Sequence, residues 1–307
     1  MYHLKRRTVY KSLLKKVDVE DVDLCHATTL FSDGGLAYLL YRRTNIPYFV
    51  TVRITDLLFL LKAPHTWLSA KKILLNASKI IFVSPTLQNK FCSHRFVKKY
   101  LPVIEKKIVL SRNGIDDYWI DNVNTYRRID SHNVLYIGTM IRRKNPLLLI
   151  ESVLELKNKY SDIKLNIIGA TGEDETAVIE KAKVNSDVIT YYGRITDKTV
   201  LKEHYRNNSI FVLPSVRETF GLVYLEALSQ NIPVIYIKGE GIDGLLNDYN
   251  GEGLECPSVE NIKESIEKVF KFYNKYSNKD IDFESFRWSK IASEYYKLYS
   301  NCCHKSV

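Results

Sequence analysis

The chain has 307 residues, with 45 Lys and Arg against 35 Asp and Glu, and 45% of its residues are apolar. These proportions are ordinary for one large or two average domains, and they exclude a disordered chain, a collagen-like fibre and a small disulfide scaffold. The charge is uneven, because residues 1–130 hold 22 Lys and Arg against 11 Asp and Glu, whereas residues 131–307 hold 23 against 24. A basic half is typical of a protein with an anionic partner: nucleic acid, a membrane or a phosphorylated substrate. A basic surface without a partner is the alternative.

No run of apolar residues is long enough to span a membrane, and the basic start of the chain lacks the apolar core of a signal peptide. The five cysteines have no metal-ligand spacing and suit a reducing compartment, so we expect a cytoplasmic protein. They are Cys25, Cys92, Cys256, Cys302 and Cys303.

In chain order, residues 5–16 are predicted to form a basic amphipathic helix, and short apolar runs then alternate with helical patterns. Strands are predicted over Asp23–Ala27, Tyr48–Val52, Lys79–Val83 and Ile108–Leu110, and helices over Gly35–Arg43 and Trp67–Asn76 and from Pro85. The polar stretch Tyr118–His132 has no period and is interpreted as a linker.

The alternation is sharper after this linker. Strands are predicted over Asn133–Ile137, Lys164–Ile168, Val188–Tyr192, Ser209–Leu213 and Pro233–Ile237. Helices are predicted over Pro146–Lys159, Glu173–Lys183, Asp197–Arg206, Gly221–Gln230, Val259–Tyr273 and Phe283–Tyr299. Apolar strands that alternate with helices indicate an α/β protein with parallel sheets covered on both faces. We expect an N-terminal domain over residues 1–125, a C-terminal domain over 126–278, and a final helix in 279–307 that crosses back to the first domain.

The most informative segment runs from Leu213 to Leu228, where a strand ends, a loop carries Glu218 and a helix begins near Gly221. The first backbone amides of a helix lack partners within it and form a natural anion site, and a glycine there leaves room for a phosphate or a sugar. Glu226 lies in the second turn, where its carboxylate can accept two hydrogen bonds from a ribose diol. Either glutamate alone is more often a surface residue, but their spacing around Phe220 and Gly221 favours a site.

This segment resembles the E-x7-E signature of retaining glycosyltransferases of the GT-B fold, specifically glycosyltransferase family 4. Further segments resemble the family's motifs in the family's order: 26–34 (H-x-H…D-G), 51–56 (t-v-R-g-t-D), 112–116 (N-G-V/I-D), 138–145 (G-R-x4-K-G) and 192–195, which packs against the nucleotide base. The resemblance covers residues 20–275. It implies two Rossmann-like, doubly wound domains that face a cleft, the N-terminal one incomplete, because family members carry further strands before the first of these motifs.

The resemblance also implies roles for the matching residues. Lys144 would stabilise the charge that develops on the departing nucleoside diphosphate, Glu218 would contact the donor sugar, and Glu226 would bind the ribose. The other implied donor-side residues are Thr219, Phe220, Gly221, Leu222, Gly138, Thr139, Arg143, Gly193 and Arg194. Thr139 stands where the family has Arg, so Arg142 or Arg143 is a candidate for that contact. A solvated loop over residues 142–144 is the alternative.

On the acceptor side the resemblance implies His26, Asp33, Gly34, Arg53 and Asp56. A structural role for His26, a helix cap for Asp33 and a surface position for Arg53 remain open alternatives. The resemblance implies transfer on the front face of the sugar with no metal ion or cofactor, although Glu218 could instead be a covalent nucleophile.

We therefore expect a metal-independent, retaining glycosyltransferase of the hexosyltransferase type, acting in the synthesis of cell-surface polysaccharide or glycolipid. Its expected partners are a nucleotide-diphosphate-sugar, a glycan or lipid-linked acceptor with a free hydroxyl, and the anionic inner face of a membrane, which the basic half suits. A non-catalytic nucleotide-sugar-binding remnant or partner subunit is the main alternative. Only the charge supports a nucleic-acid binder, and the Glu218–Glu226 pattern argues against a sugar-nucleotide epimerase.

Overall fold

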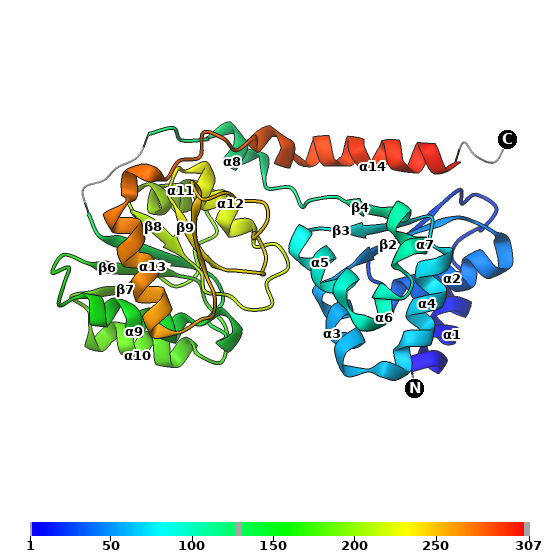
Figure 1. Cartoon of the computed structure of the whole chain (residues 1–307), viewed down its shortest axis with the longest axis horizontal. Coiled ribbons are helices and arrows are strands. Elements are labelled where there is room, and N and C mark those ends of the chain that lie inside the picture. Colours follow the sequence, from blue (N-terminus) through cyan, green and yellow to red (C-terminus); the bar gives the residue numbers. More distant parts are fainter. Residues whose placement is uncertain (1, 127–130, 304–307) are drawn as a thin grey trace. The chain divides into compact units, whose positions relative to one another are not determined.

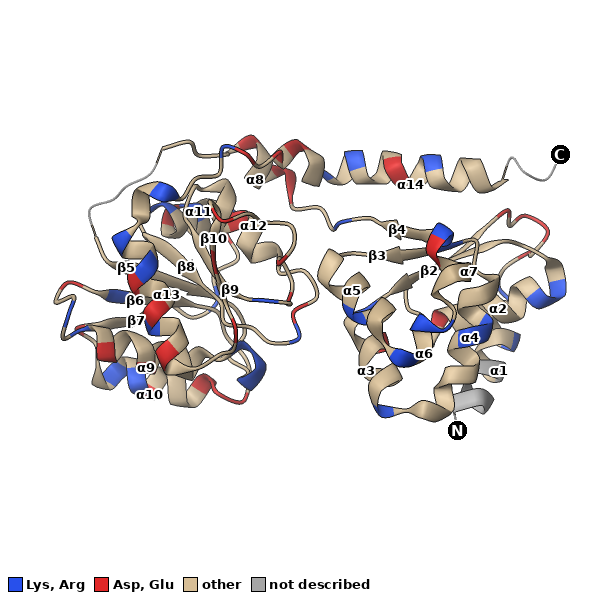
Figure 2. Ribbon diagram, viewed as in Figure 1, with Lys and Arg blue, Asp and Glu red and all other residues tan. Residues whose placement is uncertain are grey.

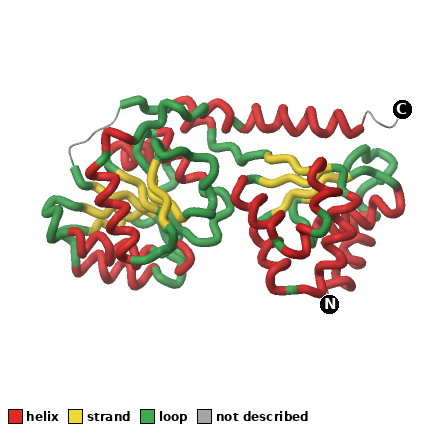
Figure 3. Tube along the Cα trace, in the orientation of Figure 1, coloured by secondary structure: helices red, strands yellow, loops and turns green. Residues whose placement is uncertain are grey.

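The computed structural model describes residues 2–126 and 131–303 and divides the chain into two compact units (Figure 1). Unit 1 contains the residues up to Asn113 and those from Ser289 onward, whereas unit 2 is continuous from Gly114 to Trp288. Each unit has one sheet, with its strands inside and its helices on the faces (Figure 3). Every described strand pair is parallel, which confirms the α/β class with two parallel sheets.

The sheet of unit 1 has the order β1-β2-β3-β4. Its strands are β1 (Cys25–Ala27), β2 (Tyr48–Val52), β3 (Lys79–Phe82) and β4 (Ile108–Leu110). The helices of this unit are α1 (Tyr2–Leu13), α2 (Asp33–Thr44), α3 (Ile54–Lys62), α4 (Trp67–Asn76), α5 (Pro85–Ser93), α6 (Arg95–Lys98), α7 (Leu101–Ile104) and, from Ser289 onward, α14 (Trp288–Cys303).

The two faces of this sheet have different covers, since alternate residues of a strand point to opposite faces. Val50 and Phe82 belong to the apolar core that the sheet forms with the helices between its strands. His26 and Phe49 instead contact the ring of Tyr299 in α14. Figure 1 shows α3 and α4 on one side of the sheet and α14 along the other. The second face is therefore covered by a helix from the end of the chain.

Among the described residues the sheet of unit 2 has six strands; α9 to α12 lie between successive strands in sequence, α8 precedes β5 and α13 follows β10. The strands are β5 (Asn133–Ile137), β6 (Lys164–Ile168), β7 (Ile189–Tyr191), β8 (Ile210–Val212), β9 (Val234–Ile237) and β10 (Gly251–Leu254). The helices are α8 (Asp117–Asp121), α9 (Pro146–Leu156), α10 (Glu175–Val184), α11 (Lys198–Arg206), α12 (Leu222–Ser229) and α13 (Val259–Lys271).

The strand order β10-β9-β8-β5-β6-β7 reverses at β5. The chain passes from β5 through β6 to β7 at one edge and then returns to β8 on the other side of β5. In open parallel sheets, ligands bind at the carboxyl ends of the two strands where the order reverses. The loops that leave β5 and β8, residues 138–145 and 213–221, start at this point.

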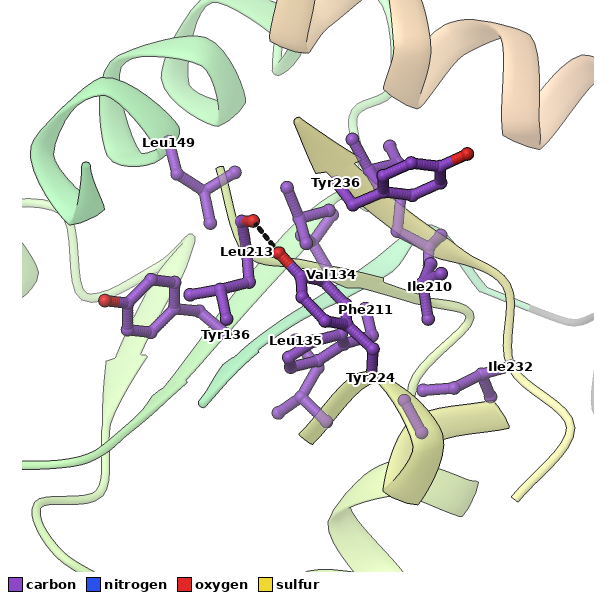
Figure 4. Packing of buried hydrophobic residues seen from close by; sticks show 14 of the residues in the cluster. Val134, Leu135, Tyr136, Leu149, Ile210, Phe211, Leu213, Tyr224, Ile232 and Tyr236 are labelled. Carbon is purple, nitrogen blue, oxygen red and sulfur yellow. Dashed lines mark hydrogen bonds between the residues drawn. The ribbon is translucent and has the colours of Figure 1, made fainter. Parts of the chain in front are cut away.

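Close packing fixes the end of β8 against α12 (Figure 4). Tyr224 of α12 is 1% exposed, and its Oη donates a hydrogen bond to Leu213 O at 2.6 Å. Its ring meets Phe211 of β8 edge-on, with 5.7 Å between ring centroids. Each fully buried side chain of this kind stabilises the fold by about 1.5–3 kcal/mol. The loop between β8 and α12 is thus anchored at both ends.

Several expectations about single elements were wrong. The stretch interpreted as a linker begins with α8, because Asp116 Oδ1 accepts a hydrogen bond from Tyr118 N at 3.0 Å and caps this helix; residues 127–130 of it lie outside the described residues. The sequence pattern also gave no indication of α3 or β10. Helix α14 belongs to unit 1 from Ser289 onward, in line with the final helix expected to cross back to the first domain.

Candidate active site

Two hydrogen bonds join the loops that leave β5 and β8. Val216 N donates to Arg143 O at 2.8 Å, and Asn145 Nδ2 donates to Pro214 O at 2.7 Å. Asn145 has a φ of 52°, a left-handed conformation that Asn adopts more readily than most residues. This conformation turns the chain from the short 3₁₀ helix Arg142–Lys144 into α9. The predicted donor-side residues of both loops therefore lie at one place, the switch point of the sheet.

Lys144 folds back over the first residue of its loop. A Cβ on Gly138 would lie 3.3 Å from Lys144 Cδ and 3.4 Å from Nζ, so the glycine leaves the space that the lysine uses. Burial lowers the pKa of Lys144; Glu218 acts against this effect and Arg143 adds to it. An anion bound beside the ammonium would stabilise its charged form.

Glu218 is held by both carboxylate oxygens. Its Oε2 accepts a hydrogen bond from Ser215 Oγ at 3.1 Å and lies 3.8 Å from Arg143 Nη1, while its Oε1 accepts one from Thr219 N at 3.2 Å. The Glu218 side chain is 15% exposed, whereas that of Arg143 is 41% exposed. A shielded carboxylate thus stands beside one exposed cation, Arg143, and one half-buried cation, Lys144. This set can accept hydrogen bonds from sugar hydroxyls and neutralise a diphosphate.

A third loop, residues 239–244, supports the backbone of Glu218. Glu218 N donates to Glu240 Oε2 at 3.1 Å, and Gly241 N donates to Glu218 O at 2.9 Å. Gly241 has a φ of 43°, and a Cβ there would lie 2.9 Å from Glu218 Cγ. Close contact between the two loops therefore requires a glycine at position 241.

The turn from Thr219 to Leu222 leads into α12. Gly221 has a φ of 76°, and a Cβ there would lie 2.5 Å from the Tyr224 ring. Phe220 is 2% exposed and anchors the turn in the core. Within the described part of the chain, no hydrogen bond is found for the backbone N–H of Phe220 or Gly221. These two N–H groups are therefore available to donate hydrogen bonds to a bound anion, as predicted from the sequence.

Glu226 lies one turn further into α12 and keeps part of its surface exposed. Its Oε2 accepts a hydrogen bond from Tyr205 Oη of α11 at 3.0 Å. Burial raises the pKa of Glu226 to about 7; the Tyr205 hydrogen bond lowers it, the charge of Asp116 raises it and that of Lys198 lowers it.

The remaining predicted donor-side residues lie at the same edge of the sheet. Gly193, after β7, accepts a hydrogen bond at its carbonyl oxygen from Gly169 N at 2.8 Å. The next residue, Arg194, is exposed. Thr139 is also exposed, and its carbonyl oxygen accepts a hydrogen bond from Tyr136 Oη at 2.9 Å.

On the acceptor side, the contacts of His26 favour the structural alternative. Its Nδ1 lies 2.6 Å from Tyr299 Oη and its Nε2 lies 2.9 Å from Thr51 Oγ1, so both ring nitrogens have partners. Burial, and secondarily the charge of Arg53, lower its pKa. His26 joins β1 to α14 within unit 1.

Asp56 also has structural contacts. It is 3% exposed, and its carboxylate accepts hydrogen bonds from the backbone N–H groups of Arg53 at 2.9 Å, Leu30 at 3.0 Å and Phe31 at 3.2 Å. Burial raises the pKa of Asp56, and these hydrogen bonds oppose the rise. The carboxylate therefore fixes the start of α3 against the loop after β1.

Asp33 and Arg53 meet at Thr28, at the carboxyl edge of the unit 1 sheet. Thr28 Oγ1 donates to Asp33 Oδ2 at 2.6 Å, and Arg53 Nε donates to Thr28 O at 3.2 Å. Gly34 is buried at the first turn of α2, where a Cβ would lie 3.1 Å from Val50 Cγ2. Of the acceptor-side predictions, only Asp33 and Arg53 combine a charge with exposure at this edge.

Within the described residues, no three His, Cys, Asp or Glu side chains form a group that could hold a metal ion. Metal independence stays a prediction. None of the described helices is both long and apolar enough to cross a membrane.

Sequence reasoning gave no role to two residues that hold the site together, Glu240 and Tyr205. The only signal for Glu240 was its place between two glycines after a strand, a pattern that is weak by itself. No signal pointed to Tyr205, because its hydroxyl reaches Glu226 from a different helix.

The six-stranded sheet, with its site at the switch point, defines a Rossmann-like α/β protein. The family model described as glycosyl transferases group 1 matches residues 126–280, which hold every predicted donor-side residue. The chain belongs to this family.

Relatives and solved structures agree with this assignment. The chain is 25% identical over 258 residues to an uncharacterised glycosyltransferase of Methanocaldococcus jannaschii, covering 84% of this chain and 68% of the relative. It is 29% identical over 222 residues to the capsular polysaccharide biosynthesis glycosyltransferase CapM of Staphylococcus aureus, covering 66% and 55%. The fold is similar to that of Anabaena HepE in complex with UDP, with a TM-score of 0.74, 15% identity, and coverage of 96% of this chain and 82% of that one. Such solved structures are GT-B glycosyltransferases, which confirms the predicted fold.

Proposed function

We propose that the protein is a retaining glycosyltransferase of family 4 that transfers a hexose from a nucleotide-diphosphate-sugar to a hydroxyl acceptor. The observation that carries the proposal is the cluster of Glu218, Arg143 and Lys144 at the switch point, with Glu226 eight residues beyond Glu218. Arg143 and Lys144 face the diphosphate, Glu218 accepts hydrogen bonds from the donor sugar, and Glu226 binds the ribose.

In the proposed reaction, the bond between the anomeric carbon and the diphosphate oxygen breaks, and the acceptor oxygen bonds to the same face of the sugar. The acceptor proton passes to the departing phosphate oxygen, and Lys144 and Arg143 stabilise the charge of that group. The alternative role of Glu218 is that of a covalent nucleophile, with Ser215 and the Thr219 amide holding its two oxygens in place. NMR of the product, which reports the anomeric configuration, tests retention.

The donor is proposed to be a UDP-sugar, because HepE and other proteins of similar fold were solved with UDP. Thermal-shift measurements with UDP-, GDP-, ADP- and CMP-sugars test this, since a ligand that binds the native state raises the melting temperature.

Donor turnover by the unaltered protein and by Glu218→Ala separates the enzyme from a non-catalytic binding subunit. Exposed Glu264→Ala is the matched control. If the unaltered protein binds the donor but turns it over with no acceptor tested, the proposal that it is an enzyme fails. Because the reaction is expected to need no metal ion, EDTA treatment should leave turnover unchanged.

The proposed acceptor is a glycan or lipid-linked glycan in polysaccharide synthesis, as the name of CapM suggests. Its place would be the cytoplasmic face of an anionic membrane. A groove of about 570 Å³ between α2 and α4 supports membrane contact, because its lining includes Arg42, Arg43 and Lys72 and, among the described residues, no acidic side chain. Figure 2 shows Lys and Arg positions on both helices. Leu68, at the groove, is 72% exposed.

Flotation with vesicles tests this contact. The protein is expected to float with vesicles that contain phosphatidylglycerol and not with neutral phosphatidylcholine vesicles, and salt should weaken the association. Leu68→Asp should reduce flotation, whereas Val184→Asp, at an apolar residue of unit 2 that is 83% exposed, should not. Equal flotation of both variants would exclude this surface.

A further inference from the structure

Tyr205 and Glu226 form a pair that links two helices of unit 2. Tyr205 of α11 is completely buried, and its Oη lies 3.0 Å from Glu226 Oε2 and 3.4 Å from Val223 O. The ring is fixed by edge-on contact with Trp119, with 5.4 Å between centroids. A hydroxyl has one proton, and the shorter contact to the carboxylate is the stronger hydrogen bond.

This hydrogen bond leaves one carboxylate oxygen for a ligand. Among the described residues no hydrogen bond reaches Glu226 Oε1, and Glu226 keeps part of its surface open. A half-buried carboxylate with a single donor has several rotamers and two protonation states. The buried tyrosine selects one orientation and favours the charged form.

We propose that Tyr205 is a positioning residue for donor binding, which holds the carboxylate of Glu226 oriented and ionised for the ribose hydroxyls. The inference rests on the proposed function, because it assigns the ribose to Glu226. Tyr205 itself lies behind Glu226 in the core and does not touch the ligand.

Few other charged groups act on this carboxylate. The charged groups that act on Glu226 are Asp116, in the segment before α8, and Lys198, in α11. These two residues form an ion pair with each other. Their effects on Glu226 have opposite signs, so the Tyr205 hydroxyl is the main neighbour that favours the ion. Burial already raises the pKa of Glu226 to about 7.

Donor affinity should therefore depend on pH near neutrality. A protonated Glu226 is a poorer acceptor for the ribose, so binding weakens as the pH falls through the pKa of this group. Removal of the Tyr205 hydroxyl removes a stabiliser of the ion, so the pKa of Glu226 rises and the loss of binding begins at higher pH.

The test uses the full chain and Tyr205→Phe, which keeps the ring. UDP-glucose is the probe, because its diphosphate is esterified at both ends and does not titrate near neutral pH. Titration calorimetry from about pH 5.5 to 8.5 should give a midpoint about one unit higher in Tyr205→Phe and about five- to tenfold weaker binding at pH 7. Tyr273→Phe is the matched control, since this buried hydroxyl donates to Ser209 O at 2.9 Å, away from Glu226.

Two further measurements distinguish the possible failures. In the Glu226→Gln background, Tyr205→Phe should have little further effect, because the two residues act through one interaction. Carboxyl ¹³C NMR of the ligand-free protein reports the ionisation of Glu226 directly, and its midpoint should rise in Tyr205→Phe and stay constant in Tyr273→Phe. If no nucleotide-sugar binds but this midpoint rises, the proposed function fails and the pairing stands. If UDP-glucose binds and neither its pH profile nor the NMR midpoint changes in Tyr205→Phe, the inference is overturned.

Discussion

At the residue scale, the site depends on two cations of different exposure beside one carboxylate. The glycine at position 138 lets the Lys144 side chain lie over the loop, where burial lowers its pKa. Arg143 is more open and lies 3.8 Å from Glu218. Half-buried Lys144 has fewer water contacts to lose than exposed Arg143 when a diphosphate binds, so its interaction with the ligand is the stronger one.

We predict that Lys144→Gln lowers kcat by about 10²–10³-fold, the usual effect of removing one group that stabilises charge in a transition state. Steady-state kinetics with the donor found in the thermal-shift screen measure this. Lys183→Gln, at an exposed lysine of α10, should retain the activity of the unaltered protein. Equal activity of the two variants would contradict the role of Lys144.

A second residue-scale prediction concerns Glu240. In Glu240→Ala the backbone N–H of Glu218 loses its acceptor, so Glu218 should be less well positioned and kcat should fall about ten- to a hundredfold. Glu240→Gln keeps an acceptor oxygen and should therefore retain most of the kcat of the unaltered protein. A Gln variant as impaired as the Ala variant would indicate that the charge of Glu240, and not its hydrogen bond, is required.

Sequence reasoning selected Glu218, Glu226 and Lys144 as candidates because each lies in a continuous motif. It did not identify Glu240, which is 22 residues from its partner Glu218, or Tyr205, which is 21 residues from Glu226. Such contacts depend on which loops the strand order brings together. His26 and Asp56 matched motifs as well, but their polar atoms bond to neighbours in unit 1.

At the scale of elements, the alternation of apolar strands and helices predicted most of the two sheets. The strand β10 was missed because its sequence, Gly251 to Leu254, has two glycines, which are depleted in strands. The structure gives the reason for the first of them: a Cβ at Gly251 would lie 2.0 Å from Val234 O of the neighbouring strand. Packing against the neighbouring strand, and not the strand propensity of its residues, therefore determines that β10 is a strand.

The turn into α12 offers a prediction at this scale. Gly221 and Gly193 both have positive φ, 76° and 68°, but only a Cβ at position 221 would clash, with the Tyr224 ring. Gly193→Ala should reduce stability by about 1–2 kcal/mol through backbone strain alone. Gly221→Ala should reduce it more and weaken donor binding. Urea unfolding followed by circular dichroism measures both, and equal losses would contradict the role of the clash.

At the scale of the whole molecule, α14 completes unit 1 through His26. The half-buried ring of His26 has a pKa below its usual value, so the folded state resists protonation of His26 while the undocked state does not. The contribution of His26 to docking is complete above the ordinary pKa of about 6.5 and is lost as the pH falls below that value.

We therefore predict that α14 loses amide protection from hydrogen exchange as the pH falls from about 7.5 to 5.5, after correction for the intrinsic exchange rate. Helix α9 in unit 2 is the internal reference. The pH effect on α14 should disappear in His26→Gln, which cannot be protonated. An equal loss of amide protection in α14 and α9 would contradict the role of His26 in the docking of α14.

The assignment of Ser289 and the residues after it to unit 1 has a consequence for biosynthesis. A ribosome makes a chain from its N-terminus, and domains generally fold as units when their residues have emerged. Unit 2 is continuous and can complete its core while the residues of α14 are still inside the ribosome. Until then, the sheet face with Phe49 and Ile81 in unit 1 lacks its cover. The N-terminal unit therefore finishes folding only after the residues of α14 have emerged.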